Sequence, residues 1–128
     1  MVSKIIVVDD EHSIADSISE IIANSGYEVR HCYSGSEALA ILDDFPPDLL
    51  LSDVLMPGVN GFELALELKQ RFPMCRLLLF SGQAATAIVA QKFIEIFSQK
   101  GYRFELLPKP IHPTALLAKI EESLLQSI

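Results

Sequence analysis

The sequence is poor in positive charge and in long apolar runs. Lysine and arginine number 10 against 17 aspartates and glutamates, which gives a net charge of −7. Nucleic acid requires a basic face, and anionic membranes attract basic segments, so we expect neither as a partner. No apolar run approaches the roughly 18 residues of a membrane span. The short apolar stretch near the N-terminus is followed by acids, unlike a secretory signal.

Cysteine and histidine are also scarce. Cys32 and Cys75 lack the spacing of a metal site, so we expect reduced thiols that fill space in a cytoplasmic protein. The histidines, His12, His31 and His112, also lack metal-like spacing. We interpret them as surface or capping residues and not as a phosphorelay histidine.

The 128 residues suit a single domain over 1–128, and 50% of them are hydrophobic, enough for a sizeable core. Five apolar, strand-like runs alternate strictly with amphipathic helical stretches. This alternation predicts βαβ units and a parallel α/β sheet, in the flavodoxin-like (βα)5 doubly wound order 2-1-3-4-5. The expected strands are 4–8, 27–32, 48–53, 76–81 and 103–107, and the expected helices are 12–24, 34–44, 61–72, 84–100 and 113–126.

Polar side chains follow four of the expected strands. The first strand ends at Asp9 and Asp10, the third at Asp53, the fourth at Ser81 and the fifth near Lys109. In the predicted order these strand ends converge on one edge of the sheet, where such folds bind ligands. Several carboxylates that close together favour a bound cation, and hard oxygen ligands favour Mg²⁺. A carboxylate nucleophile that accepts a phosphoryl group suits this arrangement, with the lysine and the hydroxyl stabilising the phosphoryl oxygens.

Each of these residues also has an ordinary interpretation. Asp9, Asp10 and Glu11 could be acids that favour the start of a helix, and for Glu11 we prefer that interpretation. Ser81 could be a turn residue, and Lys109 a solvated surface lysine. The specific interpretation gains weight because the residues occur together in the predicted fold.

Four motifs in chain order resemble the receiver domain of two-component response regulators, over essentially the whole chain. They are "VVDDE" at 7–11, "SDVLMPGVNG" at 52–61, "FSG" at 80–82 and "PKP" at 108–110. The resemblance implies that Asp53 is the phosphoacceptor. It also implies that Asp53 is itself a Mg²⁺ ligand, that Asp10 binds Mg²⁺ directly, that Asp9 binds it mainly through water, and that the backbone carbonyl of Leu55 completes the protein ligands.

The same resemblance assigns the remaining site residues. Ser81 takes the place of the family's switch hydroxyl, and Lys109 is the lysine that contacts the phosphate, with a cis peptide bond to Pro110. Pro57 and Gly61 match the loop after the acceptor, where we expect glycine to tolerate backbone angles that other residues cannot adopt. The chain would then catalyse only its own phosphorylation and dephosphorylation. It would receive the phosphoryl group from a histidine kinase or a phosphotransfer protein.

The output surface that the resemblance implies is the fourth helix, fifth strand and fifth helix. A downstream protein or a second copy of the chain would bind there. Lys109 follows Ser81 by 28 positions, roughly a helical turn and a half more than is usual in the family. In this lengthened segment Ile88 and Ile94 fall outside the apolar stripe of the helix. They either form an exposed partner surface or are scattered apolar residues.

Four further residues bear on the switch or on the chemistry. Leu106 stands where receivers usually carry the aromatic residue that couples to the hydroxyl, and Phe104, with the same facing in the strand, is a weak candidate substitute. In the family that the chain resembles, the positions of Leu55, two after the acceptor, and Gln83, two after the serine, tune dephosphorylation, so we expect these residues to set the lifetime of the phosphorylated state.

Three other classes of protein are weighed against the receiver. A Mg²⁺-dependent phosphatase with an aspartyl nucleophile would need a second aspartate two residues after Asp53, where this chain has Leu55. A nucleotide or flavin binder would need a glycine-rich phosphate loop after the first strand, where three acids stand instead. A pseudo-receiver scaffold is disfavoured because all the chemical residues are present.

Overall fold

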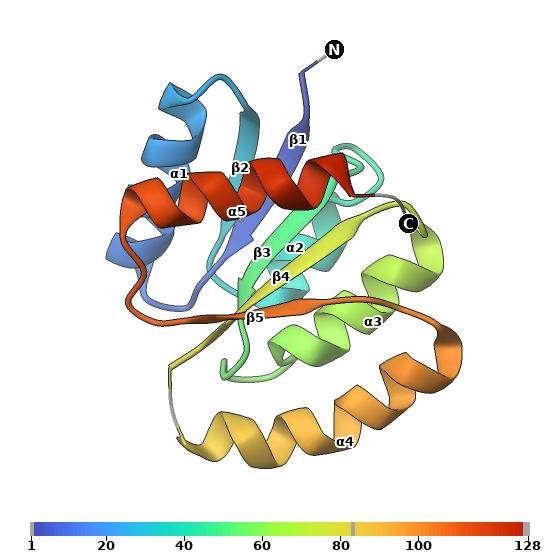
Figure 1. Cartoon of the computed structure of the whole chain (residues 1–128). Coiled ribbons are helices and arrows are strands. Elements are labelled where there is room, and N and C mark those ends of the chain that lie inside the picture. The colour runs from blue at the N-terminus through green and yellow to red at the C-terminus, as the bar shows by residue number, and fades with distance from the viewer. Residues whose placement is uncertain (1, 83, 127–128) are drawn as a thin grey trace.

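The five strands form one parallel sheet in the order β2-β1-β3-β4-β5, which confirms the predicted flavodoxin-like fold (Figure 1). The computed structural model describes residues 2–82 and 84–126, and for residues 84–88 it describes the backbone alone. The strands are β1 (Lys4–Val8), β2 (Glu28–Cys32), β3 (Leu49–Asp53), β4 (Arg76–Ser81) and β5 (Glu105–Pro108). The helices are α1 (His12–Asn24), α2 (Gly35–Ile41), α3 (Gly61–Arg71), α4 (Ala84–Lys100) and α5 (Pro113–Leu125).

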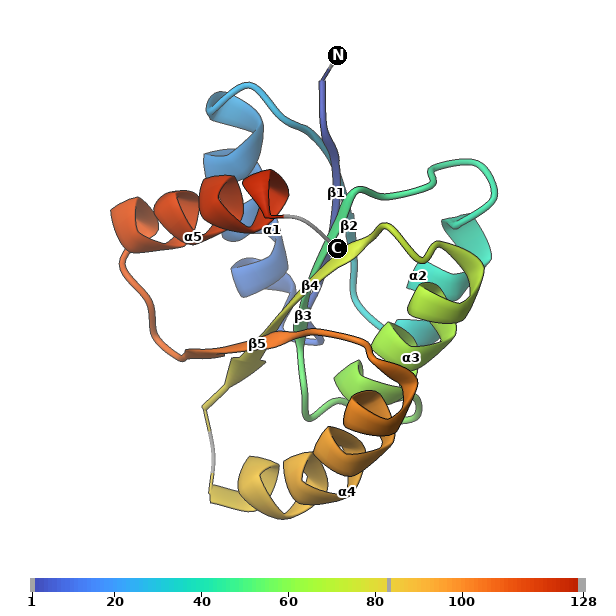
Figure 2. The same cartoon turned by 45° about the vertical axis from the view of Figure 1, so that its right-hand side comes forward.

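The sheet separates two layers of helices. Helices α1 and α5 cover one face, and α2, α3 and α4 cover the other (Figure 2). Side chains of the inner strands alternate between the layers, because successive residues of a strand point to opposite faces. Ile5 and Leu51 thus pack under α1 and α5, whereas Ile6 and Leu50 pack under the other helices. This burial on both faces explains why these strands are continuous apolar runs.

Two elements differ from the sequence-based boundaries by several residues. Helix α2 ends at Ile41 and not at residue 44, because the Asp44 N–H donates to the Ile41 carbonyl and closes a tight last turn. Strand β5 begins at Glu105 and not at residue 103. The residue before it, Phe104, packs edge-on against Phe62 and Phe97 in the layer of α3 and α4.

Helix α4 carries the expected core stripe. Phe93 and Phe97 are buried, and Val89 and Ile96 are half-buried. Ile94 lies outside the stripe and is 48% exposed, whereas the side chain of Ile88 lies outside the described residues. None of the described helices combines the length and the apolar character that crossing a membrane requires.

Candidate functional site

Three carboxylates meet where β1 and β3 end. Asp9 and Asp10 follow β1, and Asp53 is the last residue of β3. Each offers a carboxylate oxygen, and these oxygens all lie within 4.8 Å of one another. We call these three residues the acid pocket. The strands that carry them are adjacent in the sheet, at the point where the strand order reverses, which is where ligands bind in this type of fold.

The three carboxylates have different environments. Asp9 is only 1% exposed, Asp53 is half-buried and Asp10 is exposed. The Glu11 N–H donates to Asp9 Oδ1 at 3.0 Å, and the Lys109 ammonium donates to Asp9 Oδ2 at 2.8 Å. Asp9 therefore has a hydrogen bond at each oxygen. Glu11 is the N-cap of α1, as its ordinary interpretation predicts, although its side chain makes no capping hydrogen bond.

Lys109 reaches across the pocket from the segment after β5. Its Nζ lies 3.3 Å from Asp53 Oδ2 in addition to its contact with Asp9. Burial alone would lower the pKa of Lys109. The hydrogen bond to Asp9 and the charge of Asp53 outweigh that effect and raise the pKa above its usual value. Lys109 is thus a charged lysine held inside the site and not a solvated surface residue.

The charged form of Asp53 is less stable than its contact with Lys109 alone would predict. Burial raises the pKa of Asp53 above its ordinary value, and the charge of Lys109, which lowers it, does not fully compensate. The nearby charge of Asp9 raises it further. A second cation beside these carboxylates would relieve this cost. The donor set consists of hard oxygens, so the pocket fits a divalent ion such as Mg²⁺.

The end of β4 and Gly82 lie beside the pocket. Ser81 is the last residue of β4, is half-buried and pairs with Pro108 of the next strand. A Cβ added to Gly82 would lie 3.2 Å from the Lys109 Cβ, so the chain runs close against the lysine stem there. Gly82 belongs to the "FSG" motif, but no role for it was predicted from the sequence. The Lys109–Pro110 peptide bond is cis, as the resemblance implied.

The loop after Asp53 returns close to its own start at Gly61. A Cβ on Gly61 would collide with the Asp53 carbonyl oxygen, and it would lie 2.9 Å from the Val54 Cα. Gly61 has no positive φ, unlike Gly58 at 75°. The expectation that backbone angles require glycine at position 61 is therefore wrong, and close approach to the acceptor strand is the reason. Leu55 lies in this loop and is half-buried, and Gln83 lies outside the described residues.

Phe104 and His112 lie away from the acid pocket. Phe104 precedes Glu105, which pairs with Leu78, three residues before Ser81 on β4. With about 3.3 Å per strand residue, its ring is too far from Ser81 to replace the missing aromatic. The weak prediction for Phe104 is therefore wrong. His112 caps α5, since its Nδ1 accepts from the Thr114 N–H, which confirms its predicted capping role.

The fold and the acid pocket define a class of protein in which acids at the ends of β1 and β3 face a lysine after β5. A family model described as the response regulator receiver domain matches residues 5–121. The chain belongs to this family, whose members are signalling modules.

Known proteins of this family resemble the chain over nearly its full length. The chain is 32% identical over 118 residues to the DNA-binding transcriptional regulator NtrC of Salmonella typhimurium. This match covers 92% of the chain and 24% of NtrC. The chain thus spans about a quarter of the length of this relative. The structure of a CheY-like receiver domain protein from Methanospirillum hungatei superposes with a TM-score of 0.82 and 28% identity, covering 97% of this chain and 94% of that one. The structure of chemotaxis protein CheY4 of Vibrio cholerae superposes with a TM-score of 0.78 and 26% identity. The match covers 96% of this chain and 99% of that one.

Proposed function

We propose that residues 1–128 form a single receiver module that accepts a phosphoryl group on Asp53. The donor is the phosphohistidine of a histidine kinase or of a phosphotransfer protein. A carboxylate oxygen of Asp53 forms a bond to phosphorus as the bond from phosphorus to the histidine nitrogen breaks, and the imidazole leaves with the electron pair. The observation that carries the proposal is Asp53 at the end of β3, with Asp9, Asp10 and Lys109 gathered around it.

The metal in this proposal is Mg²⁺. Asp10 and Asp53 would hold it directly, Asp9 mainly through water, and the Leu55 carbonyl would complete the protein ligands. The burial of Asp9 and the hydrogen bonds at both of its oxygens suit an indirect role, whereas the exposure of Asp10 suits a direct one. When bound, Mg²⁺ supplies positive charge that offsets the carboxylates and the phosphoryl oxygens.

Lys109 and Ser81 respond to the new charge. Phosphorylation adds up to about two negative charges on Asp53. The Lys109 ammonium, already 3.3 Å from Asp53, can then shift its hydrogen bonding from Asp9 to the phosphoryl oxygens. The Ser81 hydroxyl donates to the same group from the end of β4. Gly82 lies against the Lys109 stem, so we infer that both movements reach the start of α4.

The output surface that we propose consists of α4, β5 and α5. Its partner is a downstream protein or a second copy of the chain, and phosphorylation shifts an existing equilibrium between two forms of this surface. The relative NtrC is named as a DNA-binding regulator, but the chain matches only about a quarter of it. We therefore propose no nucleic-acid contact for these residues, whose net charge is −7.

Chemical phosphorylation tests the proposal without knowledge of the kinase. The protein is incubated with acetyl phosphate or phosphoramidate and Mg²⁺, and its intact mass is measured. We expect a gain of one phosphoryl group that is lost in Asp53→Asn and in the presence of EDTA. The matched control is Asp44→Asn, an exposed aspartate away from the site, which should behave as the parent protein does.

The same experiment separates the rival functions. A protein that gains no phosphoryl group from any donor would be a non-switching scaffold, and our proposal would be wrong. A Mg²⁺-dependent phosphatase would instead release inorganic phosphate from small phosphomonoesters over many turnovers. The residue two positions after Asp53, where such an enzyme needs a second acid, is the half-buried Leu55.

A further inference from the structure

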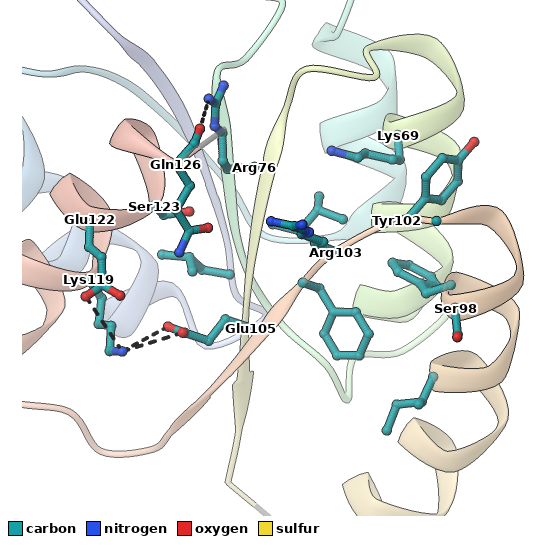
Figure 3. Close-up of a pocket in the computed structure, with 16 residues that line it drawn as sticks. Lys69, Arg76, Ser98, Tyr102, Arg103, Glu105, Lys119, Glu122, Ser123 and Gln126 are labelled. Atoms are coloured by element: carbon teal, nitrogen blue, oxygen red, sulfur yellow. Dashed lines mark hydrogen bonds and ion pairs between the residues drawn. The ribbon is translucent and has the colours of Figure 1, made fainter. Parts of the chain in front are cut away.

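A cavity of about 520 Å³ lies away from the acid pocket, around the beginning of β5. We call it the β5 cavity. Its walls come from Lys69 of α3, the first half of β4, the last turns of α4, the segment 101–105 and the C-terminal half of α5 (Figure 3). This volume lies within the range of about 300–1,000 Å³ that is typical of small-molecule sites.

The cavity exists because β5 separates from β4 at its beginning. The pairing of the two strands starts only at Leu78 and Glu105, so Arg76 and Leu77 of β4 have no paired residue on β5. The chain before Glu105 is drawn toward α3 and α4 by the packing of Phe104 and Tyr102 against Phe97. Residues 101–105 of the lengthened segment between Ser81 and Lys109 thus form part of the wall of this cavity.

The charge of the cavity opposes that of the whole chain. Four cationic and two acidic side chains line it, although the net charge of the protein is −7. The two acids, Glu105 and Glu122, lie near Lys119 at 3.3 and 4.0 Å. No ion pair joins the other three cations, Lys69, Arg76 and Arg103, to a carboxylate within residues 2–82 and 84–126.

Lys69 and Arg76 have further features that point to a missing anion. Lys69 is only 4% exposed, and its ammonium has one acceptor among the described residues, the Cys75 carbonyl at 2.7 Å. Burial lowers the pKa of Lys69 from its usual value, and the charge of Arg76 lowers it further. The buried Nε of Arg76 has no hydrogen-bond partner in the described part of the chain. A buried donor without an acceptor, such as this Nε–H, lowers the stability of the protein unless a ligand supplies the acceptor.

Part of the remaining wall is apolar. Leu77, Phe97 and Phe104 line it, together with Ile94, which is 48% exposed. Figure 3 shows Tyr102 and Lys69 on the side of α3 and α4, and Lys119 and Glu122 on the side of α5. The Arg103 side chain lies between these two groups, with its nitrogen atoms toward β4.

We propose that the β5 cavity binds a small organic anion, a carboxylate or phosphoryl group attached to an apolar or aromatic body. Arg103 and Lys69 attract the anionic group, and Arg76 offers its unpartnered Nε–H. The apolar body lies against Phe97, Phe104 and Ile94, where it removes apolar surface from water. This site is separate from Asp53, and the inference does not depend on phosphorylation of that residue.

Titration of the full chain with phenylphosphonate tests this site. The protein carries ¹⁵N, EDTA is present, and amide chemical shifts are followed by NMR. We expect saturable shifts at residues 76–78 and 101–105, with a Kd of about 1 mM or tighter. Inorganic phosphate, which lacks the body, and benzyl alcohol, which lacks the charge, should each bind more weakly.

Two variants and one control sharpen the test. Arg103 is exposed, so Arg103→Gln should fold normally, and its loss of a charged hydrogen bond should weaken binding about tenfold or more. Ile94→Ser should reduce the preference for phenylphosphonate over inorganic phosphate. Arg30→Gln, an exposed arginine on β2 at the opposite edge of the sheet, should bind as the parent does.

Several outcomes would overturn the proposal. They are no saturation up to about 10 mM phenylphosphonate, shifts confined to the ends of β1 and β3, and equal binding of the parent and Arg103→Gln. Equal affinity for phenylphosphonate and inorganic phosphate would contradict the apolar part of the site.

Discussion

The Lys109 ammonium lies closer to Asp9 than to Asp53, at 2.8 Å against 3.3 Å. Asp9 is the more buried of the two acids, with 1% of its side chain exposed against 15% for Asp53. Lys109 is therefore the main counter-ion of a buried carboxylate in addition to its proposed contact with the phosphoryl group. The role that the resemblance implies for Lys109, contact with the phosphate on Asp53, accounts for only one of its two contacts.

Lys109→Met should lower the free energy of unfolding by about 2–4 kcal/mol in EDTA, because it leaves Asp9 charged, buried and without its cation. The estimate lies below the full cost of breaking a buried pair because the Lys109 side chain is 21% exposed. Urea unfolding followed by circular dichroism measures the change. Millimolar Mg²⁺ should reduce the difference between variant and parent, since it supplies the missing positive charge.

Lys119→Met is the matched control for that prediction. Lys119 pairs with Glu105 and Glu122, but all three side chains are at least 38% exposed. Its removal should cost under about 1 kcal/mol and should not respond to Mg²⁺. If the two variants lose equal stability, the buried pair with Asp9 does not have the weight that we assign to it.

Asp53→Asn should stabilise the protein at neutral pH in EDTA. Burial raises the native pKa of Asp53 above its unfolded value, despite Lys109. Stability is therefore lost as the pH rises from about 3.9 through the native pKa, and the loss is complete above the native pKa. Asparagine carries no such charge, so the gain should be present at pH 7 and should shrink toward pH 4.

Denaturant unfolding at several pH values measures this gain. Lys109 retains its hydrogen bond to Asp9 in the variant, so the substitution leaves no lysine stranded. The exposed Asp44→Asn should show little change across the same range. A variant that is less stable than the parent at pH 7 would mean that the lysine contact outweighs the burial of Asp53.

The sequence predicted the strand order and the acid pocket because both depend on periodic patterns. Alternating elements imply a parallel sheet, and in such a sheet the residues after β1, β3 and β5 must meet at one edge. That argument needs no side-chain detail, and it brought Asp9, Asp53 and Lys109 together correctly. The strand order could not predict whether the Lys109 ammonium lies closer to Asp9 or to Asp53, because rotamers and burial decide which carboxylate is nearer.

Sequence patterns are less informative where tertiary packing overrides local preference. The run from Arg103 is apolar enough for a strand, yet Phe104 packs with Phe62 and Phe97 instead, and β5 starts two residues late. The β5 cavity follows from this displacement and has no signature in the local sequence. Gly61 was singled out correctly, but for the wrong physical reason, since its contact is with a distant backbone segment.

Both cysteine thiols should be inert in the native protein at pH 8. Burial raises the pKa of Cys75 to about 12, and burial with the charge of Glu37 raises that of Cys32 to about 11. The native state therefore holds these protons more tightly than the unfolded chain, whose thiols have a pKa of about 8.5. Stability should fall as the pH rises above that value.

A disulfide reagent that reports thiolate release measures this protection. Cys32 is 4% exposed and Cys75 is 1% exposed, so we expect both to react only after unfolding in urea. Single Cys→Ala variants assign the two signals. Native reaction of either thiol at the rate of the unfolded chain would contradict the prediction.

Gly61→Ala should damage both stability and phosphorylation. The added Cβ collides with the Asp53 carbonyl, so the acceptor strand or the start of α3 must move, at a cost of about 1–3 kcal/mol.

Gly58→Ala provides the comparison, because Gly58 has a φ of 75° but open space around it. That variant should lose roughly 1–2 kcal/mol through backbone strain alone and should leave Asp53 in place. The two variants should thus lose similar stability, while only Gly61→Ala slows phosphorylation by acetyl phosphate in Mg²⁺. Equal phosphorylation rates in the two variants would show that the close approach of Gly61 does not position the acceptor.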